Sequence, residues 1–152
     1  MEYETGQTGR VIVLRLSDGD PVYKSVEDVA RNEGISAATV WIVGGIKNGG
    51  VVVGPKVENV FPLQTLERAF SDAREIVGFG TVFANEYNEP KLHLHAAIGK
   101  GGEVIVGCPR IGADCWLINE IVMLEITGLS ARRKKDAASG LELLTLGTEK
   151  KF

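Results

Sequence analysis

Residues 90–108 have the sequence PKLHLHAAIGKGGEVIVGC, and this stretch decides the fold. Two apolar runs flank the glycine-rich segment GKGG (residues 99–102), which is the pattern of two antiparallel strands joined by a tight turn. In the first run, His93 and His95 alternate with leucine and alanine, and side chains two apart in a strand share one face. The sequence therefore predicts a β-hairpin whose first strand has one apolar face and one histidine face.

The position of Cys108 relative to the histidines depends on the turn of this hairpin. A loop made of Lys100 and Gly101 would place Cys108 opposite His93, and a loop shifted by one residue would place it opposite His95. In both registers the thiol shares the histidine face. A three-residue loop or a β-bulge would instead turn it away.

Two imidazoles and a thiolate are ligands that Zn²⁺ prefers, and three protein ligands leave one position open for water or substrate. We therefore take His93, His95 and Cys108 as candidate metal ligands and zinc as the candidate ion. The alternative is that both histidines are ordinary hydrogen-bonded residues of a half-buried sheet and that Cys108 is a small buried apolar residue. The spacing alone does not separate these two interpretations.

The rest of the chain adds further strands. Apolar runs bounded by Gly, Pro, Asn or Asp predict strands at residues 10–16, 38–46, 51–54, 75–84, 91–99, 103–108, 117–127 and 141–146. Residues 63–73 fit either a short helix or an irregular loop.

One helix is expected between the first two strands. Val22, Val26, Val29 and Ala30 recur at helical spacing, with Asp20 as the cap, Pro21 at the first helical position and Gly34 after the last turn. The predicted fold class is therefore α+β, a mainly antiparallel sheet with one main helix packed on it.

The composition fits one globular domain over residues 1–152. We expect its core at about residues 9–128 and a C-terminal loop and strand at residues 129–152. Of the 152 residues, 44% are hydrophobic and 24% are charged, and the 19 glycines favour many turns. The net charge of -3 gives no overall attraction to nucleic acid or anionic lipid. No apolar run is long enough to span a membrane, so we expect no membrane contact and a cytoplasmic location.

Other residues are candidates for the same site or for a second one. Glu120 interrupts an apolar face of its strand, so it is a candidate metal ligand, general base or partner of an imidazole, the alternative being an edge position or a subunit contact. Arg110 could hold an anionic substrate beside a metal, whereas Asp114 and Cys115 are expected to be loop residues. One basic run could contact nucleic acid or simply be solvated in a loop. It consists of Arg132, Arg133, Lys134 and Lys135.

Several stretches together resemble the plant-and-prokaryote conserved (PPC) domain, a DNA-binding-like domain. They are RVIVLRLSDGD (10–20), REIVGFGTV (74–82), INEIVML (118–124) and the hairpin sequence quoted above. The resemblance runs from about Arg10 to Gly128 and implies an α+β fold and a homotrimer, with the histidine face near the subunit boundary.

The resemblance also bears on the site. The third metal position of the family is usually a histidine after two glycines, and here Cys108 stands in its place. Two glutamates of the family map onto Glu120 and Glu75. In plants the domain is coupled to AT-hook motifs that grip the minor groove, and this chain has no Arg-Gly-Arg-Pro segment.

Two functional hypotheses follow. The first is a homotrimeric binding or regulatory module whose ligand is DNA or a small molecule, with any DNA contact depending on a partner or on the basic run. The second is a zinc-dependent enzyme acting on a small substrate, in which the three candidate ligands activate water and Glu120 or Glu75 transfers protons. We favour the first, because a fold resemblance does not establish an activity.

Overall fold

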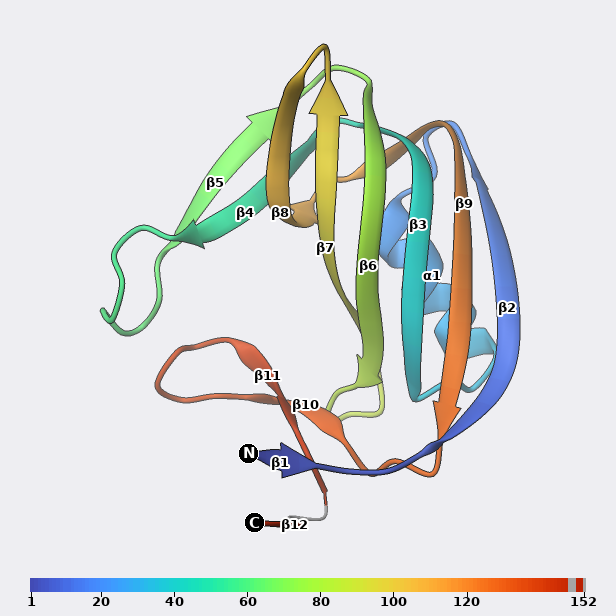
Figure 1. Ribbon diagram of the computed structural model, residues 1–152, viewed down its shortest axis with the longest axis vertical. Coiled ribbons are helices and arrows are strands. Elements are labelled where there is room, and N and C mark those ends of the chain that lie inside the picture. Colours follow the sequence, from blue (N-terminus) through green and yellow to red (C-terminus); the bar gives the residue numbers. More distant parts are fainter. Residues whose placement is uncertain (148–149, 152) are drawn as a thin grey trace.

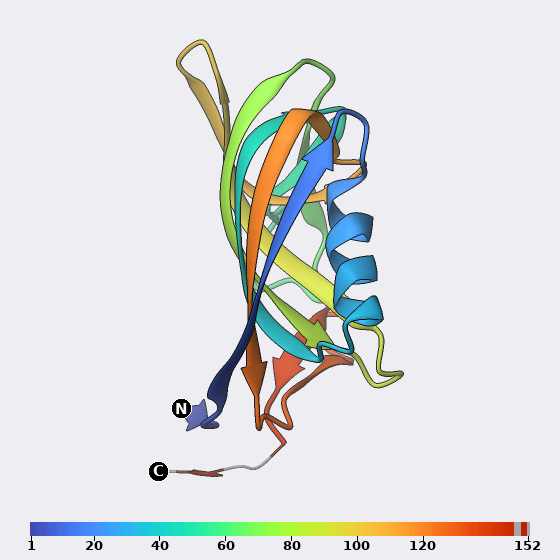
Figure 2. The same cartoon turned by 90° about the vertical axis from the view of Figure 1, so that its right-hand side faces the viewer.

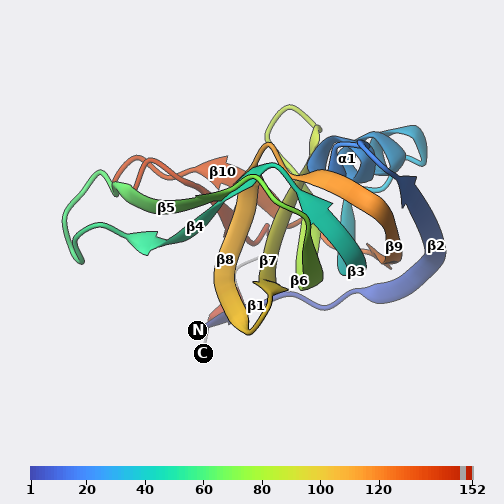
Figure 3. The ribbon, with the colours of Figure 1, turned by 90° about the horizontal axis from the view of Figure 1, so that it is seen from above.

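The computed structural model describes residues 1–147 and 150–151 and is built around one large antiparallel sheet (Figure 1). Its strands are β2 (Gln7–Ser17), β3 (Ala37–Lys47), β4 (Gly49–Pro55), β5 (Thr65–Phe70), β6 (Arg74–Ala84), β7 (Pro90–Lys100), β8 (Glu103–Ile111) and β9 (Asp114–Thr127). They lie in the order β2-β9-β3-β6-β7-β8-β4-β5. Seen from above, the sheet is strongly curved, with β4 and β5 at one end and β2 at the other (Figure 3).

Within the described residues there is one helix, α1 (Val22–Asn32), which lies along one face of this sheet (Figure 2). Its buried residues Val22, Val26 and Ala30 recur every four positions and form the stripe that packs on the strands. The α+β class is therefore confirmed. In the described part of the chain no helix is long and apolar enough to cross a membrane.

The start of α1 differs from the prediction. Pro21 is the N-cap in an extended conformation and makes no side-chain capping bond, so Asp20 is not the cap. The Asp20 carboxylate instead accepts a hydrogen bond of 2.8 Å from the backbone N–H of Ser17. This bond closes the turn that follows β2. It engages the carboxylate that would otherwise cap α1.

Four described segments adopt strands that the sequence did not predict. Residues 65–70 form β5, an edge strand paired with β4, where a helix or a loop was expected. The basic run forms β10 (Arg132–Lys135) instead of a loop and pairs with β11 (Glu142–Thr145), which confirms the expected last strand. The short strands β1 (Glu2–Tyr3) and β12 (Lys150–Lys151) also pair. Of these, only the β1–β12 pair joins segments far apart in sequence. β5 and β10 pair with strands close to them in the chain, and each becomes a strand because of a partner that its own local pattern does not show.

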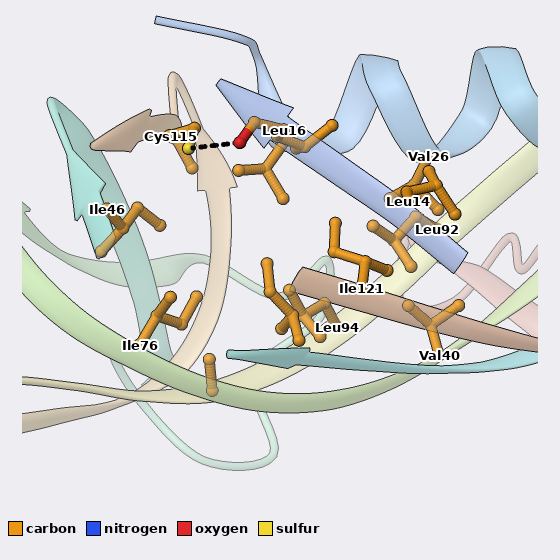
Figure 4. Close-up of a cluster of buried hydrophobic side chains, with 14 of the residues drawn as sticks. Leu14, Leu16, Val26, Val40, Ile46, Ile76, Leu92, Leu94, Cys115 and Ile121 are labelled. Carbon is orange, nitrogen blue, oxygen red and sulfur yellow. Dashed lines mark hydrogen bonds between the residues drawn. The ribbon is translucent and has the colours of Figure 1, made fainter. Parts of the chain in front are cut away.

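The main core lies between α1 and the sheet. Alternate strand residues point into it, as the two-residue period of a strand requires. Cys115 is fully buried in β9, so the expectation of a loop residue is wrong, and its Sγ lies 3.7 Å from the Leu16 carbonyl oxygen (Figure 4). Other core residues drawn there are Leu14, Val26, Val40, Ile46, Ile76, Leu92, Leu94 and Ile121.

The opposite face of the sheet, which we call the outer face, is also rich in apolar side chains. Residues paired across β9, β3, β6 and β7 share this face, as in the row Val122, Trp41, Phe79 and His95. Its exposed apolar members are Val11, Val13, Trp41, Val43, Val77, Phe79, Val104, Val106 and Val122, and Val13 reaches 73% exposure.

The β7–β8 hairpin separates before it reaches the histidines. Lys100 pairs with Glu103, so Gly101 and Gly102 form the loop, one of the two registers expected. The ladder ends at the pair Ala96–Gly107, and β8 then pairs with β4.

Gly107 makes this change of partner possible. A Cβ atom there would lie 2.2 Å from the Val52 carbonyl oxygen of β4, a distance that no side chain tolerates. The close approach of β4 and β8 thus requires glycine immediately before Cys108.

We expect Gly107→Ala to lower the free energy of unfolding by about 1–3 kcal/mol, because the added methyl group pushes β4 and β8 apart. Gly99→Ala is the matched control on the neighbouring strand, where the nearest backbone atom lies 3.3 Å from the added Cβ. It should change stability by less than about 0.5 kcal/mol. Urea unfolding at matched protein concentration measures both. Equal stabilities of the two variants would contradict the close approach.

Candidate metal centre

Because β8 leaves β7 at Gly107, residues 90–95 of β7 form a free edge in the described structure. Side chains take the place of a neighbouring strand there. The Leu92 N–H donates a hydrogen bond of 3.0 Å to Glu27 Oε1 of α1, and Arg133 Nε donates one of 3.4 Å to the Lys91 carbonyl. Unpaired edge groups are thereby satisfied, and α1 and β10 are held beside the edge.

The two faces of β7 are as predicted. Leu92 and Leu94 are buried in the core, whereas His93 is half-buried and His95 exposed on the outer face. Their Nε2 atoms lie 3.2 Å apart, and the ring planes meet at 73°.

Cys108 completes a cluster with the two histidines. One ligand atom from each of His93, His95 and Cys108 lies within 4.8 Å of the other two. Two ligands of one tetrahedral zinc ion are roughly 3.3–3.8 Å apart, given bond lengths of about 2.0–2.1 Å to nitrogen and 2.3 Å to sulfur. The donors therefore fit a shared ion after small side-chain adjustments.

Cys108 does not have the surroundings of a purely apolar cysteine. It is buried, yet its Sγ accepts a hydrogen bond of 3.3 Å from Arg110 Nε and lies 3.5 Å from the Tyr23 hydroxyl oxygen. The Sγ of Cys115, by contrast, donates a hydrogen bond to the Leu16 carbonyl oxygen within the core. The polar neighbours of Cys108 favour the interpretation as a ligand over that as a space-filling residue.

Burial and positive charge both favour the neutral form of the two imidazoles. The pKa of His93 is lowered by burial first and then by the charges of Arg133 and Arg110. The pKa of His95 is lowered by burial and then by the charges of His93 and Arg110. Neutral imidazole is the form that binds metal ions, so these shifts favour metal binding. Tyr23 remains a neutral hydroxyl, because burial and then the charge of Cys108 raise its pKa.

A cavity of about 410 Å³ opens beside the cluster, at the free edge of β7. Tyr23 and Glu27 of α1 form one wall, and His93 belongs to the lining. Arg110 and Arg133 reach it from β8 and β10. The structure thus places Arg110 beside the candidate ligands, as the sequence suggested.

The four residues of the basic run do not share one environment. Arg133 turns inward, where it donates a hydrogen bond of 3.1 Å to Thr81 Oγ1 and lies over the Phe83 ring. Arg132 is half-buried, and Lys134 and Lys135 are exposed. Sequence reasoning missed Arg133 as a pocket residue because it assumed a loop, whereas the alternation of a strand would have separated it from its neighbours.

The two glutamates lie away from the histidines within one chain. Glu120 is on the outer face of β9, opposite Arg15 and Val43, and β3 and β6 separate it from β7. Glu75 pairs with Gly99 at the turn end of β7, about 13 Å along the strand from His95. Their catalytic role stays a prediction.

The class of protein follows from a match to a family profile. The sequence profile of the Plants and Prokaryotes Conserved (PCC) domain matches residues 3–127, which is most of the chain. The chain therefore belongs to the PCC domain family, the family that its sequence resembles.

Solved structures support the same fold. A metal-containing protein from Archaeoglobus fulgidus is 23% identical, with a TM-score of 0.82 over 95% of this chain and 99% of its own. A plant- and prokaryote-conserved (PPC) protein from Pyrococcus horikoshii is 22% identical, with a TM-score of 0.78 over 94% and 99%. A protein from Ralstonia eutropha, named as a candidate DNA-binding protein, is 18% identical, with a TM-score of 0.71 over 88% and 90%. Identities this low establish the fold alone. A comparison with curated proteins finds no match.

The charge environment of the histidines is testable in the metal-free protein. We expect both imidazoles to titrate below 6.5, and Arg110→Met to raise both pKa values because it removes a nearby positive charge. Arg68→Met, a change on the distant strand β5, is the control and should leave them unchanged. NMR titration of the imidazole resonances measures these values. Titration of both rings at or above 6.5 would contradict the described environment.

Proposed function

We propose that this chain is a homotrimeric PCC-domain module that binds a divalent metal ion, with zinc as the candidate. The observation that carries the proposal is the convergence of His93, His95 and Cys108 within 4.8 Å. Two imidazoles and one thiolate suit Zn²⁺ and leave a fourth position for a ligand. A relative of the same fold is named a metal-containing protein, which supports a metal here.

A regulatory or binding role fits better than catalysis. A zinc enzyme would use the bound ion to activate water, and it needs a general base within hydrogen-bond reach. Neither Glu75 nor Glu120 lies near the histidines within one chain.

The two cysteines are free and buried, which suits the reducing environment of the cytoplasm.

The outer face supports assembly into a homotrimer. Its exposed valines, together with Trp41 and Phe79, form a broad apolar surface over neighbouring strands. Monomeric proteins seldom expose so extended an apolar surface, since burying it against another copy is favourable. A homotrimer is also what the family resemblance implies. Glu75 and Glu120 lie on this face and would approach a neighbouring copy there.

DNA binding is a second candidate function. It is favoured by the names of two relatives of the same fold, from Ralstonia eutropha and Bacteroides thetaiotaomicron, which are candidate DNA-binding proteins. In this chain the inward turn of Arg133 leaves Arg132, Lys134 and Lys135 for phosphates. Three phosphate contacts on an acidic protein would give weak binding with a shallow salt dependence. A trimer or a partner would have to supply more contacts.

We expect about one zinc ion per chain in protein purified without added metal, and its loss in Cys108→Ala. Cys115→Ala is the matched control, because it removes the other buried thiol and leaves the cluster intact. Atomic emission measures the metal content. Substitution with Co²⁺ should give a sulfur-to-metal charge-transfer band that Cys108→Ala abolishes. Near-zero metal in the intact protein, or equal metal in both variants, would contradict the proposal.

We expect sedimentation equilibrium to give three times the chain mass of 16.4 kDa. Val77→Lys should dissociate the assembly, because a lysine at the centre of the apolar face cannot be buried without a partner. Val57→Lys is the control: Val57 is 61% exposed, against 60% for Val77, but lies outside the sheet. A monomeric wild type, or a trimer that survives Val77→Lys, would refute assembly through this face.

A further inference from the structure

The cavity at the free edge of β7 holds two guanidinium groups without carboxylate partners. Within residues 1–147 neither Arg110 nor Arg133 forms an ion pair, although Arg10, Arg31 and Arg74 all do. Arg133 is only 6% exposed. A buried guanidinium is unfavourable unless an anion compensates its charge.

Both arginines are held in place before any ligand arrives. Arg133 is fixed by Thr81 Oγ1 and lies over the Phe83 ring, while Arg110 is fixed by Cys108 Sγ. Both line the same cavity as His93. Fixed donors in a planar fork match the oxygens of a carboxylate or a phosphate.

Two carboxylates, Glu27 and Glu142, also line the cavity, but neither forms an ion pair with an arginine, and with Lys91 the lining still carries one more positive than negative charge. Glu27 already accepts the Leu92 N–H, and Lys91 lies 3.1 Å from Glu89. Glu142 is exposed on β11 and acts on Arg133 through space, without an ion pair. An anionic group could therefore occupy the space between the arginines.

The remaining lining is apolar and large enough for a small organic molecule. Leu92 is buried, and Leu141 and Leu143 close the side formed by the β10–β11 hairpin. A volume of about 410 Å³ lies at the lower end of the range for ligand sites, which is about 300–1,000 Å³.

We propose that this cavity binds a small organic anion whose carboxylate or phosphate head lies between Arg110 and Arg133, with its apolar part against Leu141 and Leu143. The inference deepens the proposed function and rests on it in one respect, since His93 would place the head beside the bound metal ion. The arginine pair itself needs no metal.

Isothermal titration calorimetry of the full chain tests the proposal, with hexanoate and inorganic phosphate as probes. The protein is measured free of metal and loaded with zinc, after removal of unbound zinc. We expect at least one probe to bind, and Arg110→Met and Arg133→Met to weaken its affinity about tenfold or more. Arg132→Met is the matched control, because Arg132 lies on the same strand outside the cavity, and it should change affinity less than about twofold.

The pattern of results separates the possible ligands and the two proposals. Binding of hexanoate alone supports a carboxylate head, and binding of phosphate alone supports a phosphate head. The inference is overturned if neither probe binds, or if Arg132→Met loses as much affinity as the cavity variants. In either case the metal proposal survives if the protein still binds zinc. Anion binding that depends on the arginines in a protein that takes up no zinc supports the cavity and refutes the metal site. Should Arg133→Met fail to fold, two other variants decide the question. They are Arg110→Met, at an exposed position, and Arg133→Lys.

Discussion

The contact between Gly107 and the Val52 carbonyl controls the arrangement of the candidate site. The absence of a side chain at Gly107 lets β4 approach β8, so β8 exchanges one partner strand for another just before Cys108. The exchange leaves residues 90–95 of β7 without a neighbouring strand on one side. The free edge, the cavity beside it and the position of the thiol near the histidines all follow from it.

The two faces of the sheet have different roles because of the two-residue period of its strands. On one face, leucines, isoleucines and valines pack against α1 and supply most of the buried core. On the other, an apolar surface extends to the row that contains His95. A site at the margin of such a surface is well placed to respond to assembly, since covering the surface would also change the access of water to the exposed imidazole.

Local sequence patterns were sufficient for the hairpin, the histidine face and the span of α1, and they left two registers open for the turn of the hairpin. Each of these depends on alternation or on residues close in the chain. The exchange of partners at Gly107, the burial of Cys115 and the inward turn of Arg133 depend on contacts between distant segments. The edge strand at residues 65–70 depends on pairing with β4, which its own residues do not reveal. The position of Arg133 in the cavity lining was accordingly missed, whereas the position of Arg110 beside the candidate ligands, two residues from Cys108, was anticipated. The replacement of the usual family histidine by Cys108 keeps a donor that suits zinc.

X-ray absorption at the zinc edge is the sharpest test of the proposed zinc site, because it identifies the atoms bound to the ion. We expect one sulfur neighbour at about 2.3 Å and two imidazole nitrogens at about 2.0–2.1 Å, with a fourth light atom completing the tetrahedron. A zinc spectrum without a sulfur neighbour would contradict the proposed site, because the ion would then not be held by Cys108 together with His93 and His95.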